Sequence, residues 1–255
     1  MVPAVVVENI SKRYHTIDGE VPALENVSFE VYEGEFIGIV GPSGCGKSTL
    51  LSIIAGLIEP SSGQVSVFGE KVTGVNPRIG YMLQRDSLFE WRTIYKNVIL
   101  GLEIQNQVTP ERLQHVEYLL DKYGLINFKN HHPSQLSGGM RQRAALIRTL
   151  AVNPDILLLD EAFSALDYQT RLAVTDDIYK IIKKEGKTAI MVTHDIAEAI
   201  SMSERLYVMS KRPGTIKMAV DIKFDIENRT PLSSREAPEF RKYFNMVWKE
   251  LDVHV

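Results

Sequence analysis

The chain has 255 residues, which is enough for one large domain or two small ones. Hydrophobic residues make up 44% and charged residues 24%, as in ordinary globular proteins, and the net charge of −3 lacks the basic excess typical of nucleic-acid-binding proteins. The single cysteine, Cys45, excludes an intrachain disulfide and fits a reducing compartment.

The predicted elements begin with a β-rich segment. Val27, Phe29 and Val31 alternate with polar neighbours, as does 63–69, and this period of two predicts half-buried strands. Short apolar runs typical of buried parallel strands follow at 36–40, 79–83, 156–160, 188–192 and 205–209. Because helical segments lie between several of these runs, we predict an α/β core with a parallel sheet.

The segment from about 85 to 152 contains no convincing strand. Residues 111–125 have helical spacing and follow Thr109-Pro110, a favourable helix start. We therefore predict a helical insertion within a domain that spans 1–221. In the remainder, 222–255, we expect an amphipathic helix packed on the core, with an apolar face of Phe240, Tyr243, Phe244, Val247, Trp248 and Leu251.

Neither a membrane span nor an export signal is expected. No apolar run approaches the roughly 18 residues that a bilayer span requires. The short apolar run at the N-terminus has no basic residue before it, so it does not resemble a secretory signal. These features favour a cytoplasmic protein and are compatible with docking onto a membrane protein.

A phosphate-binding pattern, G-x-x-x-x-G-K-[ST], is matched in full by GPSGCGKS, and it lies between an apolar run and a helical run as the pattern requires. The loop amides and the helix N-terminus would bind phosphates. Lys47 would reach the β- and γ-phosphates, and the Ser48 hydroxyl would bind Mg²⁺. The predicted nucleotide-binding residues of this segment are Gly41, Pro42, Ser43, Gly44, Cys45, Gly46, Lys47, Ser48 and Thr49.

Three further polar residues follow apolar runs and should meet at one edge of the sheet, where ligands of open α/β sheets bind. Asp160 is suited to hold Mg²⁺ through water. Glu161 is suited to orient the attacking water. His194 would reach the γ-phosphate and that water, although a lone histidine at a strand end is more often structural.

A second anion-binding helix start is predicted at LSGGMRQR, residues 136–143, where a serine and two glycines precede a helical run. With the motifs above, this octapeptide resembles the ATP-binding subunit of ABC transporters over roughly residues 4–220. Tyr14 matches the aromatic residue that stacks on adenine, Gln84 matches the glutamine that links Mg²⁺ and the attacking water to the transporter interface, and His194 matches the switch histidine. SALD at 164–167 matches the loop after the strand-end acids.

The resemblance implies a P-loop NTPase core with a parallel sheet, an N-terminal antiparallel β subdomain and an inserted α-helical subdomain. It implies ATP and Mg²⁺ as ligands and ATP hydrolysis coupled to transmembrane transport. The implied catalytic residues are Glu161, His194, Lys47 and Gln84, and the implied metal site is Ser48, Gln84 and Asp160.

The resemblance also implies partners. Two nucleotide domains, expected as a homodimer, would sandwich two ATP molecules head to tail, so that Ser137, Gly138, Gly139 and Asp167 meet the ATP held by the other copy. Two transmembrane permease subunits would hold this dimer at the cytoplasmic face of the membrane, and a solute-binding protein would act indirectly. Phe89 and Trp91 would line a groove for a permease helix, the alternative being that they belong to the insertion's own small core. No nucleic acid is expected as a partner.

Met140, where glutamine is commoner in the family, and residues 88–104 resemble the nitrate/sulfonate/taurine branch of importers, although Glu90 replaces a more usual proline. We therefore expect an ATPase that powers an importer of small anions. The alternatives are an importer of another small solute, such as a pyrimidine precursor, and an ABC ATPase without a transport role. A P-loop kinase is a third alternative, but it leaves LSGGM and His194 without a function.

Overall fold

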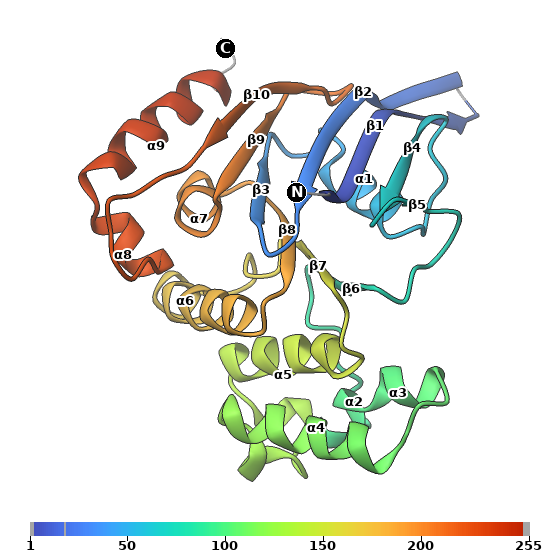
Figure 1. Ribbon diagram of the computed structural model, residues 1–255, viewed down its shortest axis with the longest axis vertical. Coiled ribbons are helices and arrows are strands. Elements are labelled where there is room, and N and C mark those ends of the chain that lie inside the picture. Colours follow the sequence, from blue (N-terminus) through green and yellow to red (C-terminus); the bar gives the residue numbers. More distant parts are fainter. Residues whose placement is uncertain (1–2, 18, 252–255) are drawn as a thin grey trace.

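The computed structural model describes residues 3–17 and 19–251. The ends of the domain and tail predicted above, residues 1–2 and 252–255, lie outside this part of the chain. Figure 1 shows two β-sheets, a group of helices beneath them and a C-terminal pair of helices along one side.

The N-terminal sheet is antiparallel, with strand order β2-β1-β4-β5. Its strands are β1 (Pro3–Thr16), β2 (Gly19–Tyr32), β4 (Ser62–Val67) and β5 (Glu70–Lys71). On β2, Val27, Phe29 and Val31 are buried and their neighbours are exposed, so the alternation in the sequence corresponds to one face packed on the core. The long β1–β2 hairpin pairs Tyr14 with Val21.

The central sheet has the order β10-β9-β3-β8-β7-β6. Its strands are β3 (Phe36–Val40), β6 (Ile79–Met82), β7 (Ile156–Asp160), β8 (Thr188–Thr193), β9 (Arg205–Met209) and β10 (Ile216–Asp221). The pairs from β9 to β6 are parallel, and β10 runs antiparallel to β9 at the edge. No residue of β10 is fully buried, and for this reason it lacks the continuous apolar run that marks the other strands.

Helices and loops alone connect β6 to β7. The helices are α2 (Ile94–Val98), α3 (Leu100–Ile104), α4 (Pro110–Lys122), the short 3₁₀ helices η1 (Ile126–Phe128) and η2 (Pro133–Gln135), and α5 (Gly138–Ala151). The Thr109 side chain accepts a hydrogen bond from the Arg112 N–H, which caps α4, and Pro110 occupies its first position. This helical group lies below the central sheet in Figure 1 and packs around Leu102, Leu119 and other fully buried residues.

The remaining helices are α1 (Lys47–Ile54), α6 (Tyr168–Lys184), α7 (Ile196–Met202), α8 (Pro231–Glu236) and α9 (Pro238–Leu251). Val247 on α9 is fully buried in a cluster with Ile200 of α7 and Val208 of β9. Beside it, the rings of Phe244 and Trp248 are stacked with centroids 6.0 Å apart. Of the helices in the described ranges, 3–17 and 19–251, none combines the length and apolar character that crossing a bilayer demands.

The parallel register fixes where the functional side chains can meet. Val40 at the end of β3 pairs with Thr193 of β8, and Asp160 at the end of β7 pairs with Val192. The segments that follow these three strands therefore leave the sheet at the same edge, where an open α/β sheet binds its ligand.

Candidate functional site

The loop between β3 and α1 carries the phosphate-binding pattern. Gly46, the residue before α1, has a φ of 104°, and a Cβ there would lie 2.9 Å from the carbonyl oxygen of Ala23. Only glycine satisfies both this left-handed conformation and this close approach to β2. The loop consequently ends at a helix N-terminus, whose N–H groups and dipole attract phosphate.

The Lys47 side chain lies inside the curve of this loop and is only 5% exposed. Its Nζ donates hydrogen bonds to the carbonyl oxygens of Gly41 at 2.8 Å and Pro42 at 3.0 Å. The loop thus positions a buried cation at the N-terminus of α1, where a phosphate would be bound.

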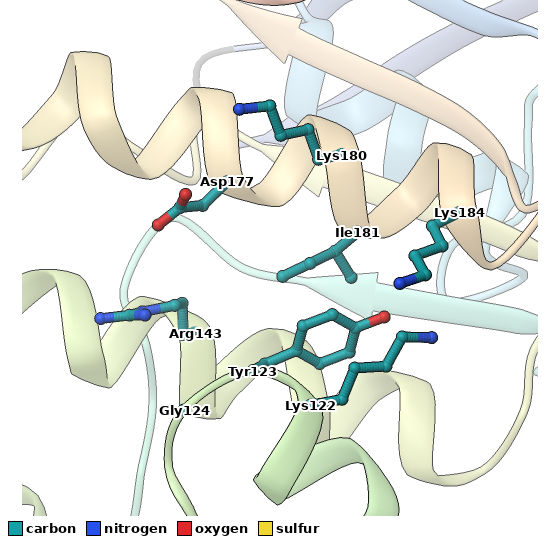
Figure 2. A pocket seen from close by; sticks show the side chains of 8 residues that line it. All are labelled: Lys122, Tyr123, Gly124, Arg143, Asp177, Lys180, Ile181 and Lys184. Carbon is teal, nitrogen blue, oxygen red and sulfur yellow. The ribbon is translucent and has the colours of Figure 1, made fainter.

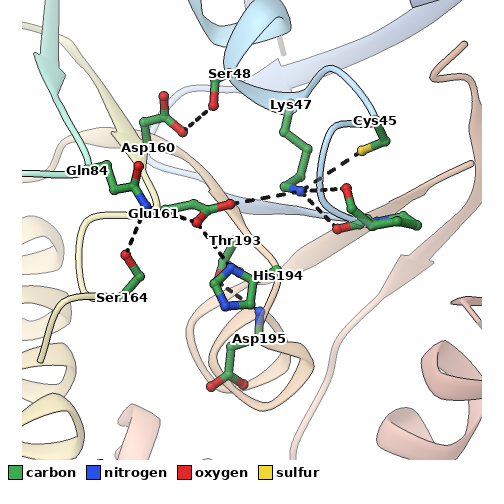
Figure 3. A network of polar contacts seen from close by, with 12 residues as sticks. Cys45, Lys47, Ser48, Gln84, Asp160, Glu161, Ser164, Thr193, His194 and Asp195 are labelled. Carbon is green, nitrogen blue, oxygen red and sulfur yellow. Dashed lines mark hydrogen bonds and ion pairs between the residues drawn. The ribbon is translucent and has the colours of Figure 1, made fainter. Parts of the chain in front are cut away.

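Asp160 is held from both of its oxygens. The Ser48 hydroxyl donates to Oδ1 at 2.9 Å, and the Tyr81 hydroxyl donates to Oδ2 at 3.0 Å. Burial raises the pKa of Asp160, and these two hydrogen bonds oppose that rise. The predicted metal residues Ser48 and Asp160 therefore lie together, as Figure 3 shows.

Glu161 lies at the centre of the predicted catalytic residues (Figure 3). Its Oε1 lies 4.0 Å from Nζ of Lys47, and its Oε2 lies 3.1 Å from Nδ1 of His194. The Gln84 side-chain amide donates to Oε2 at 3.4 Å. The backbone of Glu161 has a φ of 45°, a conformation that costs a non-glycine residue roughly 1–3 kcal/mol and that tends to occur at functional sites. The structure brings the four predicted catalytic side chains into one cluster.

A hollow of about 250 Å³ lies beside this cluster. Its lining contains Tyr14, Gly44, Gly46, Lys47, Ser48, Thr49 and Glu161, all predicted site residues, together with Ala23 and Arg212. The Tyr14 hydroxyl forms a 3.3 Å hydrogen bond with the Thr49 hydroxyl. The predicted adenine-stacking residue therefore lies directly beside the phosphate loop.

The signature residues, those of LSGGM at 136–140, occupy a different place together with Asp167. Ser137 caps the N-terminus of α5, its hydroxyl accepting from the Met140 N–H at 3.3 Å, and Asp167 caps α6 by accepting from the Thr170 N–H at 3.1 Å. Hydrogen bonds from Thr170 lower the pKa of Asp167. Within the described chain, Ser137, Gly138, Gly139 and Asp167 are not part of the lining of the P-loop hollow.

Two site residues with polar side chains, Tyr81 and Arg212, were missed by the sequence analysis. Tyr81 could have been suspected, because a tyrosine in a buried strand needs a partner for its hydroxyl. Arg212 follows β9 in a turn with no binding pattern, so nothing in the sequence signalled its place in the hollow.

A larger hollow, of about 430 Å³, lies between α4, α5 and α6 (Figure 2). Four basic side chains line it, but Lys122 is paired with Glu185 and Lys180 with Asp176. None of the predicted catalytic residues belongs to its lining. Its cations are thus partly neutralised, and it is separate from the cluster in Figure 3.

Neither the adjacent His131 and His132 nor Cys45 adds a second site. Across the described ranges, no group of three or more His, Cys, Asp and Glu side chains is arranged to hold a metal ion. Nδ1 of His132 lies 3.1 Å from the carbonyl oxygen of Glu90, as a loop contact. Burial raises the pKa of the Cys45 thiol, and the nearby Lys47 opposes that rise. A buried, protonated thiol is a poor nucleophile.

Comparison with known proteins identifies the family. Residues 24–164, more than half of the chain, match the family model described as ABC transporter. The chain belongs to the ABC transporter family. Its fold and its nucleotide-binding edge are accordingly those of an ABC ATPase, which binds and hydrolyses ATP.

Several curated ABC transporter proteins are similar over most of their length. The uncharacterized ABC transporter ATP-binding protein YtlC of Bacillus subtilis is 47% identical over 246 residues, 96% of this chain and 95% of that one. The nitrate import ATP-binding protein NrtD of Synechocystis is 43% identical, covering 90% of this chain and 88% of its own. The taurine import ATP-binding protein TauB of Ruegeria pomeroyi is 45% identical, covering 82% and 79%.

A solved structure agrees with the fold described above. The dimeric structure of MJ0796, a bacterial ABC transporter cassette, superposes with a TM-score of 0.73 at 34% identity, covering 86% of this chain and 99% of that one. A second structure of the same cassette is described as a dimeric post-hydrolysis state bound to ADP and Pi.

Proposed function

We propose that this ABC ATPase powers an importer of small anions such as nitrate, sulfonate or taurine, at the cytoplasmic face of the membrane. The observation that carries the proposal is the Glu161 carboxylate held between Lys47 and His194 beside the P-loop hollow. The substrate class is supported by the nitrate and taurine import relatives. An importer of another small solute, such as a pyrimidine precursor, is the alternative within the family.

The donor set fits Mg²⁺. Ser48 and Asp160 offer two oxygen atoms 2.9 Å apart, next to the phosphate loop. Mg²⁺ prefers oxygen ligands and is usually bound through one or two carboxylates together with substrate phosphates. Ser48 and Asp160 would hold the ion, with Gln84 completing the predicted set, and the ion would neutralise charge on the β- and γ-phosphates.

In the proposed reaction the chain positions groups and neutralises charge, with little covalent chemistry. Lys47 and the loop N–H groups bind the phosphates. Glu161 accepts a hydrogen bond from the attacking water and orients it toward the γ-phosphate. Before ATP binds, His194 lies within hydrogen-bonding distance of the Glu161 carboxylate; with ATP bound, its ring N–H donates to the γ-phosphate.

A second copy of the chain would complete each site. Among the described residues, Ser137, Gly138 and Gly139 do not line the hollow of their own chain. A helix start with a serine and two glycines supplies N–H donors for an anion. In a head-to-tail homodimer these donors and Asp167 reach the ATP of the partner, which explains why one domain carries two anion-binding helix starts.

The permease would dock on the helical insertion. Trp91 is 75% exposed and its ring lies 4.7 Å from that of Phe89, whereas Leu88 and Ile94 are buried in the insertion's own core. The fully buried Asn97 fixes this loop by accepting from the Phe89 N–H at 2.7 Å and donating to its carbonyl at 3.0 Å. An exposed tryptophan packed against a half-buried phenylalanine on a rigid loop is the kind of anchor that dominates protein interfaces.

Helix α5 holds the same loop from its other end. The Arg148 guanidinium donates to the carbonyl oxygens of Asp86 and Ser87, each at 2.7 Å. Burial lowers the pKa of Arg148, and Asp86 opposes that change. Because α5 begins at the signature residues, permease contacts near Trp91 would be coupled to the ATP of the partner chain.

We retain 1–221 as the ABC ATPase domain, with the helical subdomain at about 85–152, and 222–255 as a tail. The burial of Val247 between α7 and β9 supports a tail helix that packs on the core.

The test is reconstitution of the chain with its permease in proteoliposomes, with a solute-binding protein loaded with nitrate, a sulfonate, taurine or a pyrimidine precursor. The proposal expects release of free phosphate from ATP without an acceptor, stimulated by one of the first three solutes. Phosphate transfer to a small molecule would favour the kinase alternative. Stimulation by the pyrimidine precursor alone would overturn the anion assignment, and failure to associate with any permease would favour a non-transport ABC ATPase.

A further inference from the structure

The turn after β9 places the positively charged side chain of Arg212 at the P-loop hollow. Arg212 lines the hollow of about 250 Å³ together with Tyr14, Lys47 and Glu161. It comes from a segment more than 150 positions along the chain from the P-loop and belongs to none of the family motifs identified in the sequence. Its place depends on how the turn is attached.

Three contacts attach this turn to β2. The Gly214 N–H donates to the carbonyl oxygen of Ala23 at 2.9 Å, and the Gly214 carbonyl oxygen accepts from the Glu25 N–H at 3.0 Å. Nε of Arg212 itself donates to the carbonyl oxygen of Pro22 at 3.1 Å. The turn is therefore held through the backbone of Gly214 and the side chain of Arg212.

The turn also contacts the P-loop. A Cβ at Gly214 would lie 2.1 Å from the carbonyl oxygen of Cys45, so the two backbones are in direct contact there and only glycine fits. The segment 212–214 is thus fixed relative to the phosphate-binding loop as well as to β2.

The register of the hairpin shows which end of the hollow Arg212 faces. Tyr14 pairs with Val21, and the next pair joins Arg13 to Pro22, whose carbonyl holds Arg212. Lys47 and Glu161, where hydrolysis takes place in the proposed function, line the same hollow from the P-loop and from the residue after β7. Arg212 therefore lies at the end where Tyr14 would stack on the base.

The guanidinium has unused donors. Among the residues that the structure describes, neither Nη1 nor Nη2 has a partner, and the side chain is exposed. An arginine fork that carries only donors and a permanent charge matches an oxyanion or hydroxyl oxygens. We propose that Arg212 is a nucleotide-binding residue that contacts the ribose and α-phosphate, a contact that ATP and ADP share.

This inference rests on the nucleotide site of the proposed function, and calorimetric titration of the full chain with MgADP and with a non-hydrolysable MgATP analogue tests it. We expect Arg212→Ala to raise both Kd values by the same factor, about fivefold to tenfold, because it removes a charge-assisted hydrogen bond in a partly exposed place. Arg212→Lys, which keeps the charge, should raise the two Kd values by a smaller factor. Lys211→Ala, the exposed neighbour outside the hollow, should bind both nucleotides as the wild type does.

Two results would overturn the inference while leaving the proposed function intact. One is an Arg212→Ala protein with wild-type thermal stability and unchanged Kd values. The other is a loss confined to the ATP analogue, since that would place the guanidinium at the γ-phosphate. A wild-type chain that binds neither nucleotide would instead overturn the proposed function together with the inference.

Discussion

His194 Nδ1 lies 3.1 Å from the Glu161 carboxylate, although the two residues follow different strands. The parallel register of β7 and β8 brings the two residues together. Asp160 pairs with Val192, so the segments that follow the two strands leave the sheet at the same edge. The contact gives the histidine and the glutamate a shared position beside the P-loop.

Lys47→Ala should abolish hydrolysis, with a loss of at least about 100-fold, and should weaken nucleotide binding. The lysine is buried inside the P-loop and is the cation at the start of α1. The measurement is phosphate release at saturating ATP, with Lys71→Ala on the exposed edge of β5 as the matched control. An active Lys47→Ala enzyme would exclude the phosphate-binding role.

Ser137→Arg should block hydrolysis while the isolated monomer still binds ATP. The substitution places a long side chain at the cap of α5, away from the hollow of its own chain, so only the site of a partner is obstructed. Equilibrium binding and steady-state turnover are compared with those of Ser134→Arg, an exposed serine on the preceding 3₁₀ helix. Equal turnover in both variants would contradict a signature role across the interface.

Trp91→Ala should weaken assembly with the permease by about tenfold or more, because exposed aromatic anchors often carry an interface. Basal hydrolysis by the chain alone should not change. Co-purification and solute-stimulated turnover are the measurements, with Tyr118→Ala, an exposed aromatic on α4, as the control. If Trp91→Ala leaves both assembly and stimulation unchanged, the proposed docking site is wrong.

Glu198 should make stability depend on pH. Burial raises its pKa to about 7, with Asp195 adding to the rise and Thr193, Arg171 and Arg235 opposing it. Between its unfolded pKa of 4.5 and about 7 the native state binds the extra proton, so its contribution to the free energy of unfolding is lost as the pH rises through about 7. In urea unfolding, the free energy of unfolding of Glu198→Gln should increase relative to that of the wild type from about pH 5 to pH 8.

The matched control for that experiment is Glu236→Gln, on an exposed position of α8. It should show no such change relative to the wild type. A free-energy difference between Glu198→Gln and the wild type that is constant with pH would contradict a buried, protonated Glu198.

The sequence predicted the parts of the site that depend on local pattern. Gly46 and Lys47 belong to a motif whose spacing specifies the loop, and Asp160, Glu161 and His194 follow apolar runs that specify the sheet edge. Tyr81 and Arg212 were missed, because their roles depend on which distant segments the fold places beside them: a carboxylate 79 positions away for Tyr81 and β2 for Arg212.

The sequence likewise predicted the buried parallel strands of the fold but not the edge strand β10. Buried parallel strands have continuous apolar runs, whereas β10 is an edge strand with no fully buried residue and has no such signal. It pairs antiparallel with β9, and the turn between them is attached to β2 through Arg212 and Gly214, a contact between distant segments. Local periodicity therefore identifies the core strands, and only tertiary contacts identify the edge.

We propose that each nucleotide site is completed by a second copy of the chain. Glu161→Gln keeps the size and hydrogen bonding of the side chain but cannot activate water, so bound ATP should remain intact and hold the two copies together. Size-exclusion chromatography with light scattering at saturating MgATP should show a dimer for Glu161→Gln and a monomer for the Glu161→Gln/Ser137→Arg double variant. A Glu161→Gln protein that binds ATP and remains monomeric would contradict the claim.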